Sequence, residues 1–264
     1  MKPIITVLLS FFLAGCATSG YRQFYQSYGG VTQLKDIDIT FLPEGGEPEL
    51  YQVNTKEVDA AVRRLRSKGY LPIGYSSFNG AYEDIANAKA QAKRLKAFAV
   101  IVGVEYTDTQ TSTIPLSMPT SQTTYGSGMV SAGGAHGTYS GSSTTYGSTI
   151  VPVTTQQRRY DQNAVFLAKD NRKARFGLCC SDLESKQRQA LGRNTGSVVD
   201  VVIEKTPAFY ANIIEGDVII AIDGVPVRSA AEGYAAMNNV PKQATSSTLT
   251  IIRGGKELSI EVQF

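Results

Sequence analysis

Cysteine and histidine are the residue types best suited to covalent or metal chemistry, and this 264-residue chain has three cysteines and one histidine. Cys179 and Cys180 are adjacent, which is not a metal-ligand spacing, and His136 has no cluster of potential ligands around it in the sequence. A disulfide between neighbouring residues would be strained, because Cα atoms about 3.8 Å apart are closer than disulfides prefer. We therefore expect Cys179 and Cys180 to be small, buried or half-buried residues, one on each face if they lie in a strand.

Catalytic motifs are missing from the sequence as well. A Ser-His-Asp hydrolase needs a histidine held in a packed site, and His136 lies in the soft segment AGGAHG. There is no G-x-S-x-G, H-E-x-x-H or Walker loop, and Glu83-Asp84 is better interpreted as favourable charge at a helix start. Serine and lysine are common enough that composition alone leaves a Ser-Lys pair open. We expect no enzyme, no catalytic residue, no metal site and no cofactor.

Cys16 is the exception, because its surroundings indicate a covalent modification. The chain starts with Met1-Lys2, continues with the short apolar run IITVLLSFFL and ends this region with LAGC at Cys16. These features are typical of a cleaved signal peptide over residues 1–15, and LAGC resembles the lipobox of bacterial lipoproteins. The resemblance implies palmitate-type acylation of Cys16, and Ala17 after it resembles the outer-membrane pattern of Gram-negative lipoproteins. The alternative is an ordinary secreted protein with an incidental cysteine.

The amino-acid composition limits the kinds of molecule that we expect the protein to bind. Apolar residues make up 42% of the chain and charged residues 19%, which suits a soluble globular protein, and no other segment is long and apolar enough to span a bilayer. The net charge is +3 without a run of lysine or arginine, so nucleic acid is not an expected partner. We expect a protein that is lipid-anchored at the cell envelope, in the outer membrane if the cell is Gram-negative.

Hydrophobic spacing divides the rest of the chain into segments. Residues 16–30 are expected to be a lipidated tether, with aromatic residues at helical spacing that rest on the membrane or on the folded domain: Tyr21, Phe24, Tyr25 and Tyr28. Residues 31–169 have the pattern of an α/β sandwich-like domain, in which two helices cover an antiparallel or mixed sheet. The expected strands span 37–41, 70–77, 99–106 and 158–168, and the expected helices span 56–68, capped by Thr55, and 82–97.

A low-complexity insertion interrupts that domain over residues 109–157. It contains no Asp, Glu, Lys or Arg and is dominated by glycine, serine, threonine and tyrosine. Its glycine content favours a flexible loop, which is our expectation. The alternative is a β-hairpin arm whose tyrosines and threonines pair across strands and whose edge pairs with another chain, giving a homo-oligomer.

The last segment, residues 170–264, has several short strands, a helix capped by Thr206 with Pro207 at its first position, and a helix over 230–239 capped by Ser229. The motifs RFGLCCSDL, GSVVDVVIEKTPAFYANIIEGDVIIAIDG and LTIIRGG resemble a PDZ domain of the bacterial HtrA type. That family usually has AGI where this chain has Ala211-Asn212-Ile213, and asparagine tolerates the left-handed conformation required there. We expect an α+β fold for the chain as a whole, and the resemblance implies that it ends in a β-barrel-like domain with two helices.

The resemblance also implies a binding site. PDZ domains bind an extended peptide C-terminus as an added strand, with a turn of backbone N–H groups around its carboxylate. The matching residues are Arg175, Phe176, Gly177 and Leu178 in the carboxylate loop, Cys179 and Cys180 in the pairing strand, and Tyr234 and Met237 on the helix wall. Phe176 and Leu178 should line the pocket for the last side chain of the ligand, and Lys173 or Arg175 should help to hold its carboxylate.

Three functions remain open at this point. The first is an adaptor or scaffold that binds C-terminal or extended peptide segments of partner proteins. The second is a structural assembly lipoprotein that oligomerises through the arm while the PDZ domain packs internally. The third is a non-catalytic regulator of an envelope protease. The sequence favours the first.

Overall fold

The computed structural model describes residues 18–28 and 38–264. The signal peptide, Cys16 and Ile37 lie outside the described residues. The chain separates into two compact units, one formed by residues 106–160 and the other by the rest of the chain. Among the described residues no helix combines the length and apolar character needed to cross a membrane.

The N-terminal domain is built on a mixed sheet. Its strands are β1 (Tyr25–Ser27), β2 (Ile39–Thr40), β3 (Glu49–Val53), β4 (Tyr70–Gly80), β5 (Ala99–Ala132) and β6 (Ala135–Asp170). The order is β1-β4-β6-β5-β3, and β2 also pairs with β6. β3 runs parallel to β5, whereas β1 is antiparallel to β4 and β2 is antiparallel to β6. The expectation of a mixed sheet agrees with this topology, although β3 was not predicted.

Two helices cover the sheet, one on each face. α3 (Val58–Ser67) follows the 3-10 turn η1 (Thr55–Glu57) and packs with Ala99 and Ile101 of β5. α4 (Ile85–Arg94) packs with Val100 and Val102 of the same strand. Because alternate residues of a strand point to opposite faces, the two helices lie on opposite sides of β5. A sheet buried on both faces explains the continuous apolar run AVIV at its centre.

Two local expectations in this domain are wrong. The helix α1 (Gly20–Gln23) stops after one turn, and Tyr25 enters β1 opposite Ser76 of β4. The aromatic residues at helical spacing therefore do not form one helical face, although Tyr21 is fully buried and stacks edge-on against Phe78 with ring centroids 5.1 Å apart. The cap before η1 is Asn54, whose side chain accepts the N–H of Lys56, rather than Thr55.

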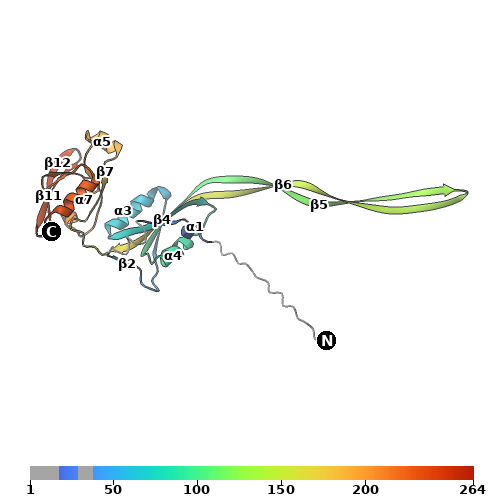
Figure 1. The fold of residues 1–264 in the computed structure, drawn as a ribbon, viewed down its shortest axis with the longest axis horizontal. Coiled ribbons are helices and arrows are strands. Elements are labelled where there is room, and N and C mark those ends of the chain that lie inside the picture. Colours follow the sequence, from blue (N-terminus) through green and yellow to red (C-terminus); the bar gives the residue numbers. More distant parts are fainter. Residues whose placement is uncertain (1–17, 29–37) are drawn as a thin grey trace, which may run out of the picture. The chain divides into compact units, whose positions relative to one another are not determined.

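Residues 106–160 form a long hairpin rather than a loop, so the favoured expectation for the insertion is wrong. β5 has 34 residues and β6 has 36, and they are joined by Gly133-Gly134 with φ of 58° and 85° (Figure 1). Two consecutive positive φ angles are what a two-residue type I′ turn requires. Hydroxyl groups meet across the strands, as between Thr113 and Thr154 at 3.1 Å. These cross-strand pairs offset the low strand propensity of the glycines.

The C-terminal segment forms a second sheet with the order β12-β11-β9-β8-β7, and β10 beside β9. The bounds are β7 (Leu178–Asp182), β8 (Ser197–Val202), β9 (Val218–Ile222), β10 (Val225–Pro226), β11 (Ser246–Arg253) and β12 (Lys256–Gln263). The expected barrel-like closure is wrong, because the sheet is open between β12 and β7. The helices are α5 (Ser185–Leu191), α6 (Pro207–Tyr210) and α7 (Ala230–Asn239), of which α5 was not expected.

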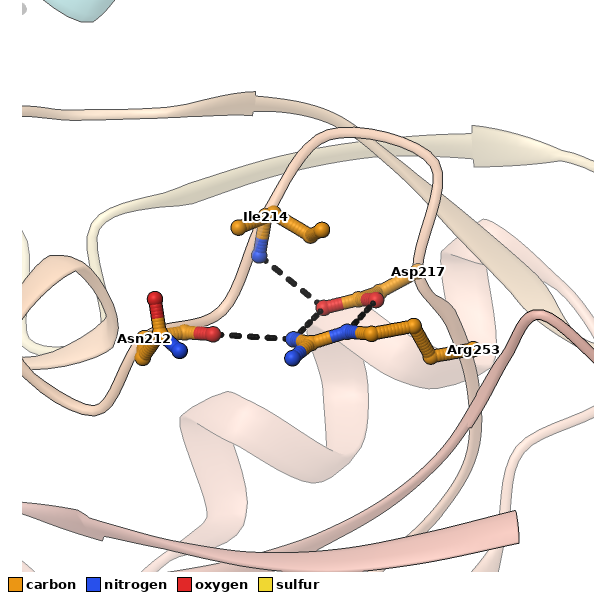
Figure 2. A network of polar contacts seen from close by, with 4 residues as sticks. All are labelled: Asn212, Ile214, Asp217 and Arg253. Carbon is orange, nitrogen blue, oxygen red and sulfur yellow. Dashed lines mark hydrogen bonds and ion pairs between the residues drawn. The ribbon is translucent and has the colours of Figure 1, made fainter. Parts of the chain in front are cut away.

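An ion pair fixes the turn between α6 and β9 (Figure 2). The carboxylate of Asp217 is almost completely buried and accepts two hydrogen bonds from Arg253, at 2.7 and 2.6 Å, and one from the N–H of Ile214 at 2.9 Å. Arg253 also donates to the carbonyl of Asn212 at 2.8 Å. Asn212 has φ of 58°, which confirms the left-handed conformation expected for it. The network therefore ties α6, β9 and β11 together around one carboxylate.

Candidate functional site

One edge of the second sheet is formed by β7, which pairs on its other side with β8. The N–H of Ile203 donates to the carbonyl of Gly177 at 2.8 Å, so Gly177 faces the strand that leads out of β8. Backbone groups alternate in direction along an antiparallel strand, which turns those of Leu178 and Cys180 away from β8. The edge of β7 thus presents the backbone of these two residues as the natural attachment points for another strand.

The hydroxyl of Tyr234, on α7, occupies the second of these points. It accepts the N–H of Cys180 at 2.8 Å and lies 3.3 Å from the carbonyl oxygen of Cys180, to which it donates. One side chain thus satisfies the donor and the acceptor that a neighbouring strand would use. Burial raises the pKa of the Tyr234 hydroxyl, and a protonated hydroxyl is what these two bonds require.

A second contact holds α7 against the end of β7. The carboxylate of Asp182 accepts the N–H of Ala230 at 2.6 Å, next to the cap that Ser229 makes by accepting the N–H of Glu232. The space between α7 and β7 is therefore bridged at two places. Asp182 was missed by sequence reasoning, because 48 residues separate it from Ala230 and only the capping pattern SAAE indicated the helix start.

Gly177 is required for packing rather than only for ligand access. Its φ is 83°, and a Cβ placed on it would lie 2.1 Å from Oγ1 of Thr206. That hydroxyl donates to the carbonyl of Ile203 at 2.6 Å and makes no capping bond to α6, contrary to the expected role of Thr206 as a helix cap. The turn before β7 is thus held by a close contact between Gly177 and Thr206.

The guanidinium of Arg175 is directed at the protein itself. It donates to the carbonyl oxygens of Val240 at 2.6 Å, Pro241 at 2.5 Å and Ala244 at 3.1 Å, and it lies over the ring of Phe264. These bonds connect the turn before β7 to the segment after α7. In this state Arg175 is engaged in anchoring that segment, so we assign no carboxylate contact to it. Lys173 is exposed just before the turn.

The three apolar residues predicted for the pocket do meet in the fold. Phe176, Leu178 and Met237 belong to the same buried cluster and are 4%, 8% and 7% exposed. Phe176 also stacks edge-on against Phe264, with ring centroids 4.9 Å apart. With so little of their surface accessible, these three side chains are packed into the core between β7 and α7, and the space between these two elements is called the closed groove below.

Cys179 and Cys180 are both free and half-buried, and alternation along β7 places them on opposite faces. Cys180 packs against the core cluster, and burial raises the pKa of its thiol to about 12. Such a thiol is neutral at physiological pH and is a poor nucleophile. Within residues 18–28 and 38–264 no cluster of His, Cys, Asp and Glu side chains could hold a metal ion. His136 contacts Ser131 beside the hairpin turn.

Comparison with known proteins matches this part of the chain to one family. Residues 174–264 match the family model of the PDZ domain. The solved structures similar to this chain include the HtrA3 PDZ domain bound to a phage-derived ligand (FGRWV), at 19% identity and a TM-score of 0.29, over 33% of this chain and 81% of that one. They also include the HtrA-type protease AlgW with decapeptide, at 19% identity and a TM-score of 0.29, over 38% of this chain and only 36% of that one.

The search of curated proteins found no match to this sequence. The family match begins four residues before β7 and ends with the last residue, so it contains the turn at Gly177, the edge strand and α7. Residues 174–264 of this chain form a PDZ domain.

Proposed function

We propose that this protein is an envelope lipoprotein that binds C-terminal or extended peptide segments of partner proteins through its PDZ domain. The observation that carries the proposal is the pair of bonds between the Tyr234 hydroxyl and the backbone of Cys180. They mark a donor and an acceptor on the edge strand of the sheet that are held by a side chain, not by another strand. An extended peptide offers the same two groups in the same geometry.

Binding would replace the hydrogen bonds that Tyr234 makes to Cys180 with hydrogen bonds from the peptide. A peptide lying antiparallel to β7 would take over the N–H and the carbonyl of Cys180 from Tyr234, and α7 would swing away to admit it. The last side chain of the peptide would then enter the cluster of Phe176, Leu178 and Met237. Its carboxylate would lie at the turn around Gly177, where the backbone N–H of Leu178 points away from β8. The match of residues 174–264 to the PDZ domain family supports peptide binding at this edge.

The remaining parts of the proposal concern where the protein acts and what it does not do. Acylation of Cys16 would hold the chain at the membrane surface, since two or more acyl chains anchor a protein stably. The protein would act as an adaptor without catalysis, because the groove offers backbone hydrogen bonds and apolar contacts and its thiol at Cys180 is neutral. Its partners would be proteins with exposed C-termini, not nucleic acids.

The experiment is a peptide-library screen on the full-length chain in detergent, with free and amidated C-termini, followed by titration of selected peptides. The test variant is Cys180→Pro, which removes the N–H that a peptide would use. Proline is tolerated at an edge-strand position whose N–H faces outward, so the β7–β8 ladder is kept. The matched control is Cys180→Val, which keeps the N–H and replaces the same side chain.

We expect Cys180→Pro to weaken binding by ~10-fold or more, because the peptide carbonyl loses its partner in the groove. Cys180→Val should bind within ~3-fold of the wild type, since it changes only packing. A folded wild-type domain that selects no peptide would overturn the proposal, and so would equal binding by both variants. Preference for free over amidated C-termini would show that the turn at Gly177 receives a carboxylate.

A further inference from the structure

The arm, defined as residues 106–160, has a regular register that assigns each of its side chains to a face. Hydroxyl contacts link Thr113 to Thr154 and Thr123 to Thr144. The two threonines of β5 are ten residues apart, and so are the two threonines of β6. Ser131 and His136 continue the same offset to the turn. The ladder therefore runs from Thr113 to the turn without a bulge, and residues directly opposite each other share a face.

All glycines within the strands of the arm lie on one of its faces. This face, called here the glycine face, consists of the even-numbered residues of β5 and the odd-numbered residues of β6. Its glycines are Gly126, Gly128, Gly137, Gly141 and Gly147. The ring of Tyr139 lies over Gly128, where a Cβ would come within 2.6 Å of it, which agrees with their position opposite each other. The other face, called the hydroxyl face, carries mostly serine and threonine.

The glycine face becomes apolar in the half of the arm farther from the turn. Ile114 and Leu116 of β5 lie opposite Val153 and Val151 of β6, and Met118 follows on the same face. All five are exposed, and Ile114 and Leu116 are 57% and 50% accessible. Apolar side chains gathered on one face of a solvated ribbon usually mark a contact surface.

Two features indicate that the contact is with an identical arm. From Thr109 to Gln157 there is no charged residue, so two copies do not repel each other electrostatically. A lone two-stranded hairpin is also marginally stable in water and needs a further layer against one face. A second copy placed by a two-fold axis along the arm brings the apolar half against the apolar half and glycines against glycines. Gly126 and Gly141 lie opposite each other with nothing within 4 Å of a Cβ, so the two backbones can approach closely there.

We propose that two copies of this chain bind each other face to face through the glycine faces of their arms. A ribbon of ~20 residue pairs is ~65 Å long and ~10 Å wide, which gives ~650 Å² per copy and ~1,300 Å² in total. That area lies within the range of specific protein–protein interfaces, ~1,200–2,000 Å². The contact is independent of the groove at β7, so it goes beyond peptide binding.

The test measures the mass of the full-length chain by light scattering, in detergent with micelles in large molar excess over protein. Val151→Lys places a charge on the glycine face, and Ile150→Lys places the same charge one residue away on the hydroxyl face. A second variant joins Gly126→Thr with Gly141→Thr, positions where a Cβ meets nothing within 4 Å in the single chain. Its control joins Ser127→Thr with Ser140→Thr on the hydroxyl face.

We expect the wild type and both hydroxyl-face controls to be dimers. Val151→Lys should weaken the dimer by ~10-fold or more, because it buries an unpaired ammonium group, and the double threonine variant should weaken it by holding the two backbones apart. A monomeric wild type overturns the proposal. It is also overturned if the two lysine variants dissociate equally, or if neither glycine-face variant dissociates.

Discussion

At the residue scale, Tyr234 determines how easily the groove opens, because its hydroxyl holds both the N–H and the carbonyl of Cys180. Tyr234→Phe removes these bonds from the free protein and leaves the ring in place. A ligand then no longer competes with the hydroxyl, so we expect its dissociation constant to fall ~3-fold, in line with the modest net value of a partly exposed hydrogen bond. Fluorescence anisotropy with a selected peptide measures this change. Weaker binding would mean that the hydroxyl contacts the peptide instead of competing with it.

Cys180 reports on the same groove through its reactivity. Burial raises the pKa of its thiol from 9.0 to about 12, and only the thiolate reacts with iodoacetamide. We expect alkylation at pH 8 to be ~10³-fold slower than for an ordinary cysteine, and its rate to rise about tenfold per pH unit between pH 7 and 9. Peptide mapping by mass spectrometry after timed labelling measures the rate. A plateau near pH 9 would contradict this expectation.

The raised pKa of Cys180 has a further consequence with a defined sign. The folded state favours the neutral thiol, so the contribution of Cys180 to stability is complete below the ordinary pKa of 9.0. It is lost as the pH rises through about 12, since the unfolded chain ionises first. Between pH 6 and 8 the thiol is almost wholly neutral in both states, so its ionisation does not make the stability of the domain depend on pH.

At the element scale, the carboxylate of Asp217 joins α6, β9 and β11, and this makes Arg253 important for stability. Arg253→Met leaves a buried carboxylate with a single partner, the N–H of Ile214. We expect the opening free energy of the PDZ domain to fall by about 3 kcal/mol. Hydrogen exchange in peptides from β9 and β11 measures it. Arg228→Met is the control, because its partner Glu232 is 3.9 Å away and both side chains are exposed, so its effect should stay below about 0.5 kcal/mol.

The arm is stabilised by local features that act together. In a two-residue hairpin the residues flanking the turn form a hydrogen-bonded pair, and pairs then alternate down the ladder. Counting from Gly133-Gly134 places Pro115, Pro119 and Pro152 at positions whose N–H would point outward. Their lack of an N–H therefore removes nothing from the ladder. The prolines occur only in the half farther from the turn. In the half nearer the turn, the outward-pointing backbone N–H groups are therefore all present and can donate hydrogen bonds.

At the scale of the whole molecule, the sequence predicted the PDZ segment well because its motifs are dense and local. Asn212 in the left-handed conformation, the cap at Ser229 and the strand containing Cys179 and Cys180 each depend on a few neighbouring residues. The closed groove could not be predicted, since it depends on contacts such as Tyr234 with Cys180, across 54 residues. The roles of Arg175 and Thr206 differ from expectation for the same reason.

The N-terminal region shows where periodicity misleads. Tyr21 and Tyr25 have helical spacing, but pairing of Tyr25 with Ser76 outweighs it, because β4 offers a strand edge. The glycine content of the insertion predicts a loop, whereas pairing across the whole hairpin decides its structure. Composition averages over both strands and therefore hides that the glycines share one face.

The unbroken register of the arm restricts how its length can change. An extra residue in one strand alone would create a bulge, and one extra residue in each strand would exchange the two faces beyond the insertion. Glycines and hydroxyl side chains would then change sides halfway along the ribbon. Only the addition or removal of two residues in each strand keeps both faces continuous. An arm of this kind can therefore change its length only in units of four residues, two in each strand.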